Sequence, residues 1–156
     1  MTGMSGAGKS SVLGELARRG FRTVDTDEEG WRSWKDGWYW REDRIDALLA
    51  APRHAPLVVS GCVTNQGRFY DRFDAVVLLS APAEVLLERI AARTTNDYGK
   101  SHEERELVLQ HIRDVEPRLR STCTHELDAT RPLSEVADAV AAIATNDARL
   151  TFQSEA

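Results

Sequence analysis

Apolar and polar positions alternate between two spacings along this chain. Helical spacing is clear near the start, where Val12, Leu13 and Leu16 would share one face. Short, continuous apolar runs between turn residues instead indicate buried strands. We therefore predict helices at residues 9–19, 41–50, 82–93, 101–115 and 133–144, and strands at residues 21–25, 56–61, 74–80 and 124–129.

The order of these elements predicts the fold class. Strands that alternate with helices are typical of an α/β domain with a parallel sheet and helices on both faces. We expect one domain over residues 1–144 and a flexible tail over residues 145–156. Ligands of such sheets bind at the carboxyl ends of the strands, where this chain has Asp25, Gly61 and Ser80.

Residues 3–10 carry the most specific motif of the sequence. They read GMSGAGKS, which fits the phosphate-binding pattern G-x-x-x-x-G-K-S. Glycines let backbone N–H groups turn toward phosphate oxygens, while Lys9 reaches the β- and γ-phosphates and the Ser10 hydroxyl binds Mg²⁺. We therefore predict that ATP and Mg²⁺ bind here, at Gly3, Ser5, Gly6, Ala7, Gly8, Lys9, Ser10 and Ser11.

The position of this motif raises a structural question. A phosphate loop normally follows a buried central strand, but only Met1 and Thr2 precede Gly3. The first central strand is therefore expected to be absent or truncated. One hypothesis, which we favour, is that the true start of the protein lies upstream. The other is that Met1–Gly3 supplies a short stub that the fold tolerates.

Two aspartates follow the strand at residues 21–25. Asp25 and Asp27 are two positions apart in an extended segment, so their side chains point the same way. The next strand ends VVSG, without the carboxylate often found there, so Asp25 is the natural residue to hold Mg²⁺ or to accept a proton from a hydroxyl. The alternative is that the two aspartates only form a turn.

Longer stretches resemble a known family. GAGKSSVLGELARRGFRTVDTDEEGW and FDAVVLLSAPAEVLLERIAAR are similar to the shikimate kinase-like branch of the nucleoside monophosphate kinase superfamily. The resemblance covers most of the chain, to about Ala144. It implies a P-loop NTPase fold, an acceptor-binding subdomain at about residues 26–50 and a lid at about 94–101. The activity it implies is transfer of the γ-phosphate of Mg-ATP to a small-molecule acceptor.

The resemblance also implies roles for single residues. WREDRIDALL is similar to an aromatic-Arg-x-x-Glu segment of that family, which puts Arg41 with Asp27 at the acceptor, although Arg44 replaces the glutamate. VVSGCV is similar to a strand that ends in a glycine run, of which only Gly61 remains.

Catalytic roles are implied for Lys9, Asp25 and Arg93, and metal binding for Ser10 and Asp25. Arg89 and Arg93 would lie over the ATP phosphates, with Arg93 at the junction between helix and lid.

All four tryptophans, Trp31, Trp34, Trp38 and Trp40, fall within ten residues. Their rings either stack on the acceptor or form a small aromatic core that holds the subdomain together, and we expect one or two of them, Trp31 included, to line the site. Such a cluster favours an acceptor that is bulkier or flatter than shikimate. Arg32, Lys35 and Arg41 offer positive charge here to a phosphate or a carboxylate.

Composition narrows the partners. A net charge of −5 gives no general attraction to nucleic acid or to an anionic membrane, so we predict neither as a partner. No apolar run approaches the roughly 20 residues of a membrane span, and no signal sequence opens the chain. The two cysteines, Cys62 and Cys123, fit reduced thiols in the cytoplasm. The partners expected are a nucleotide and a small acceptor, bound by a monomer or homodimer.

Two other functions fit parts of the pattern. A nucleoside monophosphate kinase of the adenylate type would use the aromatic cluster, although the lid has few arginines. A regulatory protein that binds ATP or GTP without phosphate transfer would share the phosphate loop. Acceptor-dependent turnover distinguishes both kinases from the regulator.

Overall fold

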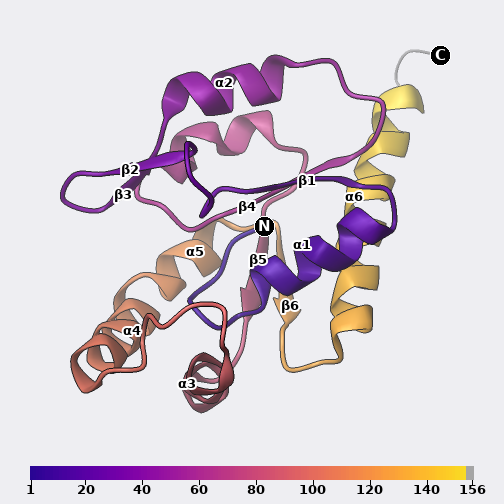
Figure 1. Cartoon of the computed structure of the whole chain (residues 1–156). Helices are drawn as coiled ribbons and strands as arrows, with labels where there is room; N and C mark the ends of the chain where they lie inside the picture. The colour runs from indigo at the N-terminus through magenta and orange to yellow at the C-terminus, as the bar shows by residue number, and fades with distance from the viewer. Residues whose placement is uncertain (154–156) are drawn as a thin grey trace.

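The structure is a computed structural model that describes the backbone of residues 1–153 and the side chains of residues 1–145. Figure 1 shows helices packed around short strands, with α6 along one side. The strands are β1 (Arg22–Asp25), β2 (Arg32–Trp34), β3 (Trp38–Trp40), β4 (Leu57–Ser60), β5 (Val77–Ser80) and β6 (His125–Asp128). The helices are α1 (Lys9–Arg18), α2 (Glu42–Ala50), the 3₁₀ helix η1 (Gln66–Arg72), α3 (Ala83–Ala92), α4 (His102–Asp114), α5 (Glu116–Thr122) and α6 (Leu133–Gln153).

Two parallel strand pairs form the framework of the sheet. β1 pairs with β4 and β5 pairs with β6, and the first two residues of the chain lie between these pairs. The Thr2 N–H donates to the Val77 carbonyl at 2.8 Å, and the Met1 amino group donates to the Val59 carbonyl at 2.8 Å. The stub thus occupies the central strand position, and the predicted α/β class with a truncated first strand is confirmed.

The short stub has a visible consequence for the sheet. Besides the two bonds that it donates, the stub accepts one from each strand pair: Leu79 N–H donates to the Thr2 carbonyl at 2.9 Å and Gly61 N–H donates to the Met1 carbonyl at 3.2 Å. Toward the amino ends of β4 and β5, a cavity of about 580 Å³ separates them. The stub therefore joins the two strand pairs by hydrogen bonds at the edge of the sheet that carries the phosphate loop.

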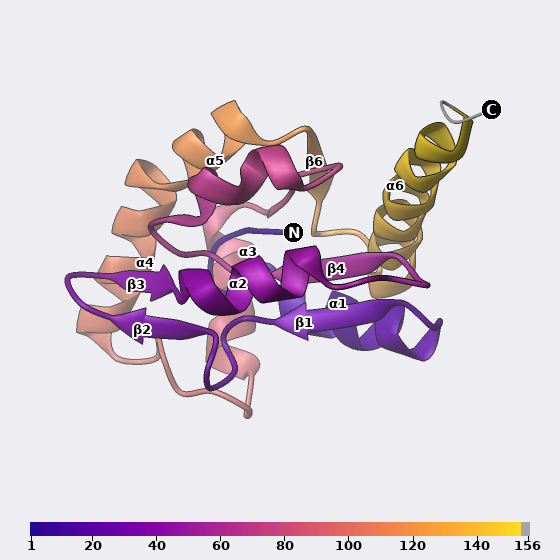
Figure 2. The ribbon, with the colours of Figure 1, turned by 90° about the horizontal axis from the view of Figure 1, so that it is seen from above.

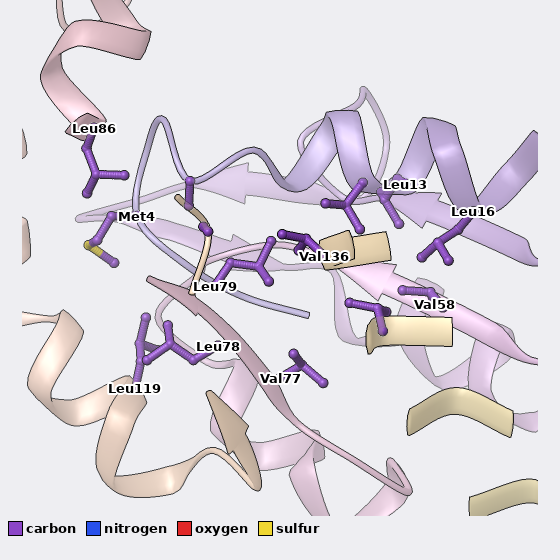
Figure 3. Packing of buried hydrophobic residues seen from close by; sticks show 14 residues of the cluster. Met4, Leu13, Leu16, Val58, Val77, Leu78, Leu79, Leu86, Leu119 and Val136 are labelled. Atoms are coloured by element: carbon purple, nitrogen blue, oxygen red, sulfur yellow. The ribbon is translucent and has the colours of Figure 1, made fainter. Parts of the chain in front are cut away.

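Apolar residues of the sheet divide between two cores. In β4, Val58 packs with α1 and α6, whereas Val59 packs with α2 and the segment before it. This alternation follows from the two-residue period of a strand. Figure 3 shows the first core, in which Leu16 from α1 and Leu79 from β5 are fully buried. The second core centres on Trp40, with Ile45, Leu48 and Leu49 from α2.

The segment at residues 26–39, expected to be irregular, contains an antiparallel hairpin of β2 and β3. Its cross-strand pairs are Arg32 with Trp40, Ser33 with Tyr39 and Trp34 with Trp38, and aromatic residues favour such pairing. Figure 2 shows the hairpin projecting from the sheet on the side away from α6. We name residues 26–40 the hairpin segment.

Other boundaries also differ from the prediction. η1 and α5 were not predicted, and Pro117 in the first turn of α5 separates it from α4. α6 continues to Gln153, so the helix does not end near residue 144 as predicted, and residues 154–156 of the predicted tail lie outside the described residues. None of the helices in the described part combines the length and apolar character needed to cross a bilayer.

Candidate functional site

The phosphate loop packs so closely against β5 and α3 that two of its glycines cannot be replaced. A Cβ atom on Gly3 would lie 2.5 Å from the Leu79 carbonyl oxygen, and one on Gly6 would lie 2.7 Å from the Leu86 carbonyl oxygen. Gly6 also has a φ angle of +84°, which L-residues rarely adopt. Helix α1 begins at Lys9, directly after the loop, so its positive end faces any anion held there.

Lys9 folds back over this loop. Its Nζ donates to the Gly3 carbonyl at 2.6 Å and to the Met4 carbonyl at 3.1 Å. Burial lowers the pKa of the Lys9 ammonium, and the nearby carboxylates of Asp25 and Asp27 oppose that shift. A cation held by two neutral carbonyls can exchange them for phosphate oxygens, which are stronger acceptors.

Both oxygens of the Asp25 carboxylate accept hydrogen bonds. One carboxylate oxygen accepts from the Ser10 hydroxyl at 2.7 Å, and the other accepts from the Asp27 N–H at 3.0 Å, so it both faces the loop and closes a turn. Ser60, opposite Asp25 in the β1–β4 register, has a buried Oγ without a hydrogen-bond partner among the described residues.

These oxygens fit the hydration shell of a phosphate-bound Mg²⁺, which needs only one or two protein ligands. No larger group of metal-ligating side chains occurs in the described part.

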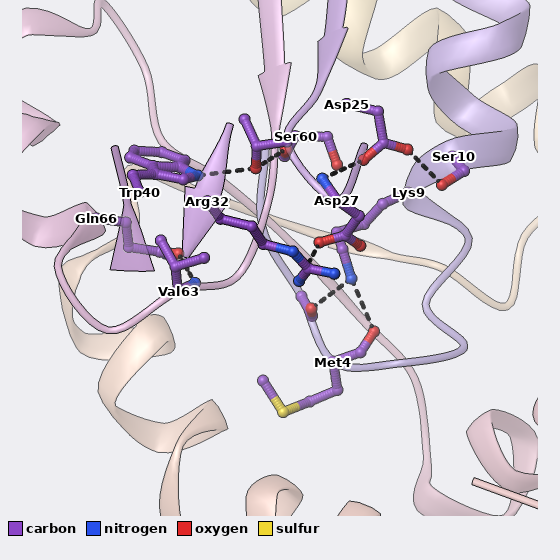
Figure 4. Close-up of polar contacts among 12 residues, drawn as sticks. Met4, Lys9, Ser10, Asp25, Asp27, Arg32, Trp40, Ser60, Val63 and Gln66 are labelled. Atoms are coloured by element: carbon purple, nitrogen blue, oxygen red, sulfur yellow. Dashed lines mark hydrogen bonds and ion pairs between the residues drawn. The ribbon is translucent and has the colours of Figure 1, made fainter. Parts of the chain in front are cut away.

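Asp27 lies in the hairpin segment and faces its strand β2. Its carboxylate forms an ion pair with Arg32 at 2.8 Å, and Figure 4 shows this pair beside Lys9. Arg32 was one of three cations that the sequence offered to a phosphate or carboxylate, but the acceptor was assigned to Asp27 and Arg41. Its pairing with Asp27 depends on β2, which brings Arg32 back toward the end of β1. The only sign of this in the sequence was the position of Arg32 among aromatic residues.

Arg89 in α3 and Arg93, which directly follows α3, contact different parts of the protein. Arg93 lies against the phosphate loop, where it donates to the Ser5 hydroxyl at 3.3 Å and to the Tyr98 carbonyl in the predicted lid at 2.6 Å. Arg89 instead donates to the Ala129 carbonyl at 2.6 Å, in the turn after β6. Arg93 thus joins loop and lid, whereas Arg89 contacts a different turn.

The other predicted acceptor residues, Arg41, Gly61 and Trp31, make their contacts with residues other than Asp27. Arg41 precedes α2, and its guanidinium lies 3.6 Å from Asp43. At Gly61, a Cβ atom would lie 2.1 Å from the Thr26 hydroxyl, so this glycine is required by packing. Trp31 is half-buried and packs against the second core.

The tryptophan cluster divides into a structural and an exposed part. Trp40 is buried; its indole N–H donates to the Thr26 hydroxyl at 2.8 Å, and its main chain bonds twice to the Asn65 side chain. Trp34 and Trp38 are exposed and meet edge to face with ring centroids 5.4 Å apart. The structure therefore shows the aromatic-core arrangement for Trp40, and the exposed rings of Trp34 and Trp38 leave acceptor stacking as a prediction.

Known proteins resemble this chain in sequence and in fold. Shikimate kinase 2 of Yersinia enterocolitica (serotype O:8 / biotype 1B) is 29% identical over 90% of this chain and 91% of its own length. The shikimate kinase of Acinetobacter baumannii, solved in complex with shikimate, superposes with a TM-score of 0.62 at 15% identity over 94% of this chain and 91% of that one. A gluconokinase from Sinorhizobium meliloti 1021 gives a TM-score of 0.62 at 22% identity over 98% and 94%.

The family described as AAA domain matches residues 1–110, more than two thirds of the chain. The matched residues include the whole phosphate loop, the hairpin segment and the predicted lid. The resemblance to shikimate kinase-like P-loop kinases is confirmed. The chain belongs to the AAA domain family, and its fold is that of the P-loop kinases.

Proposed function

We propose that this protein is an ATP-dependent kinase that transfers the γ-phosphate to a hydroxyl group of a small, acid-bearing acceptor. The observation that carries this proposal is that Lys9, Asp25 and Asp27 lie close together at the edge of the sheet that carries the phosphate loop. The relatives named as shikimate kinase and gluconokinase support phosphotransfer, and the acids in their names suggest the class of acceptor.

The arrangement gives each group a separate task. Lys9 and the loop N–H groups hold the phosphates, and Arg93 draws the lid toward them. Both oxygens of Asp25 are engaged, by the Ser10 hydroxyl and the Asp27 N–H, so Asp25 and Ser10 are suited to the metal side of the site. Asp27 has one oxygen engaged, by Arg32, which leaves the other for the acceptor hydroxyl.

The transfer exchanges one oxygen for another at the γ-phosphorus. The acceptor hydroxyl oxygen bonds to the γ-phosphorus, the bond to the β–γ bridging oxygen breaks, and ADP leaves with that electron pair. The hydroxyl proton passes to the open oxygen of Asp27. Mg²⁺, when bound through Ser10 and Asp25, would neutralise charge on the phosphates.

The two cysteines bear on the compartment in which the protein works. Cys62 and Cys123 are free thiols, which suits the reducing cytoplasm. We propose a cytoplasmic monomer or homodimer that needs neither nucleic acid nor membrane.

A nucleoside monophosphate kinase is the second candidate, because the exposed pair of Trp34 and Trp38 offers aromatic faces to a flat acceptor. It differs from the first candidate only in the acceptor.

The test measures ADP release from Mg-ATP across shikimate, gluconate, nucleosides and nucleoside monophosphates. Acid-dependent turnover that Lys9→Ala abolishes supports the proposal. Turnover only with nucleoside monophosphates supports the second candidate. ATP binding without turnover on any acceptor contradicts both and favours the regulatory alternative.

A further inference from the structure

Arg32 is the cation of the hairpin segment that points into the site. Its side chain is 22% exposed, compared with 43% for Arg41. The guanidinium carbon lies 4.1 Å from the centre of the Trp38 ring, and one nitrogen lies 2.8 Å from Asp27. Arg32 is therefore fixed on one face by an aromatic ring and on one edge by the carboxylate expected at the acceptor hydroxyl.

Most of the hydrogen-bonding capacity of this guanidinium is unused. An arginine carries five N–H donors, and within the described residues the pair with Asp27 is the one polar contact of Arg32. Its planar donor edge matches a carboxylate, which accepts two parallel N–H bonds. Stacking on Trp38 keeps the plane of the guanidinium fixed, and its remaining donors have no partner among the described residues.

The strand that carries Arg32 is anchored in the core. Arg32 is the cross-strand partner of Trp40, which the Thr26 hydroxyl and the Asn65 amide hold in place. The Arg41 N–H also donates to the Trp31 carbonyl at 2.8 Å and closes the open end of the hairpin. Such support pre-organises Arg32 at little entropic cost on binding.

We propose that Arg32 binds the carboxylate of the acceptor and thereby selects acids over neutral hydroxyl compounds. This inference rests on the proposed kinase function and adds the residue that determines its specificity. An acceptor with a hydroxyl near a carboxylate bridges the Asp27–Arg32 pair, with its hydroxyl on Asp27 and its carboxylate on Arg32. Arg41, to which the family resemblance assigns the acceptor, instead lies beside Asp43.

The experiment compares each acid with a neutral partner, shikimate with methyl shikimate and gluconate with glucose. The variants are Arg32→Ala, Arg32→Lys and Arg41→Ala, with Lys35→Ala as an exposed cation of the same hairpin. We expect Arg32→Ala to raise KM for the acid about 30-fold while kcat and KM for ATP change less than about threefold. Arg32→Lys should recover part of the loss, because it keeps the charge without the planar donor edge.

The acid-to-neutral ratio of kcat/KM decides between the two arginines. A ratio that falls toward one in Arg32→Ala, but not in Lys35→Ala, supports the proposal. Loss of the ratio in Arg41→Ala with Arg32→Ala unaffected overturns it and leaves the kinase function intact. A wild-type protein that prefers the neutral compounds also overturns it.

Binding provides a test that is independent of turnover. Trp38 lies against Arg32, so tryptophan fluorescence should change as shikimate or gluconate is titrated in the presence of ADP. If no acceptor is phosphorylated, the kinase proposal fails, but acid binding that Arg32→Ala weakens about 30-fold still supports Arg32 as the carboxylate site. Acid binding that is equal in both proteins, or absent from both, overturns the inference.

Discussion

The phosphate loop and the hairpin segment meet at one edge of the sheet but are held in place by different means. The loop is fixed by backbone geometry, since Gly3 and Gly6 pass within van der Waals contact of carbonyls in β5 and α3. The hairpin segment is fixed by side chains, with Trp40 bonded to Thr26 and Asn65. A site defined by backbone geometry can be recognised in the sequence from a short motif. A site defined by side-chain packing can be recognised only from a local enrichment in one residue type.

This difference explains why one region carries the common chemistry and the other the selectivity. Kinases of the P-loop fold must all hold the same phosphates, so the same loop serves them. Acceptors differ, and a hairpin supported by packing can change its outward residues, such as Trp34, while Trp40 stays in the core. Substitutions in either region should therefore separate activity from stability.

Lys9→Ala should reduce kcat/KM for ATP by at least about 100-fold, because the loop loses the cation that neutralises the transferred phosphate. Stability should change little, since the Lys9 charge is held at a desolvated position and its removal relieves that cost. ADP release and thermal unfolding measure the two quantities. Full activity in this variant would remove the loop from the proposed site.

Gly61→Ala should destabilise the protein by about 1–3 kcal/mol, because its Cβ would lie 2.1 Å from the Thr26 hydroxyl that bonds Trp40. Gly14→Ala in α1 is the matched control. Its Cβ meets nothing within 4 Å, so a helix-favouring alanine should stabilise by about 0.5–1 kcal/mol. Urea unfolding gives both values, and the same sign for both would contradict the packing role of Gly61.

Trp40→Phe should lower the free energy of unfolding by about 1–2 kcal/mol, because the buried Thr26 hydroxyl loses the indole N–H. Trp34→Phe, the exposed counterpart on the same hairpin, should change it by less than about 0.5 kcal/mol. Equal effects would mean that the hairpin does not divide into a buried anchor and an exposed face.

Cys62, which follows β4 between the two regions, should react slowly with iodoacetamide at pH 8. Burial raises the pKa of its thiol, partly offset by Lys9, so little thiolate is present. The native state therefore keeps this proton at pH values where the unfolded chain, with an ordinary thiol pKa near 9, has lost it. Stability is lost as pH rises above about 9.

Peptide-resolved mass spectrometry would follow the alkylation of Cys62, with the unfolded protein as reference. A native rate equal to the unfolded rate would show that Cys62 is not protected.

Local patterns were sufficient for much of the fold. The spacing of Val12, Leu13 and Leu16 predicts α1, and the pair of Ser101 and Glu104 predicts the start of α4, where both capping hydrogen bonds form. The hairpin was not predictable in the same way, because its strands have only three residues each and are stabilised by partners far along the chain. Asn65, for example, is 25 positions from Trp40.

Neighbouring residues were enough to predict the phosphate loop, the α/β alternation and the two aspartates at the end of the strand predicted at residues 21–25. Only the tertiary structure decided that Met1 and Thr2 occupy the central strand position, since their hydrogen bonds come from β4 and β5. It also decided that Arg32, and not Arg41, lies beside Asp27. A charged side chain acquires its partner from the folding of distant segments, and its own sequence neighbours do not specify that partner.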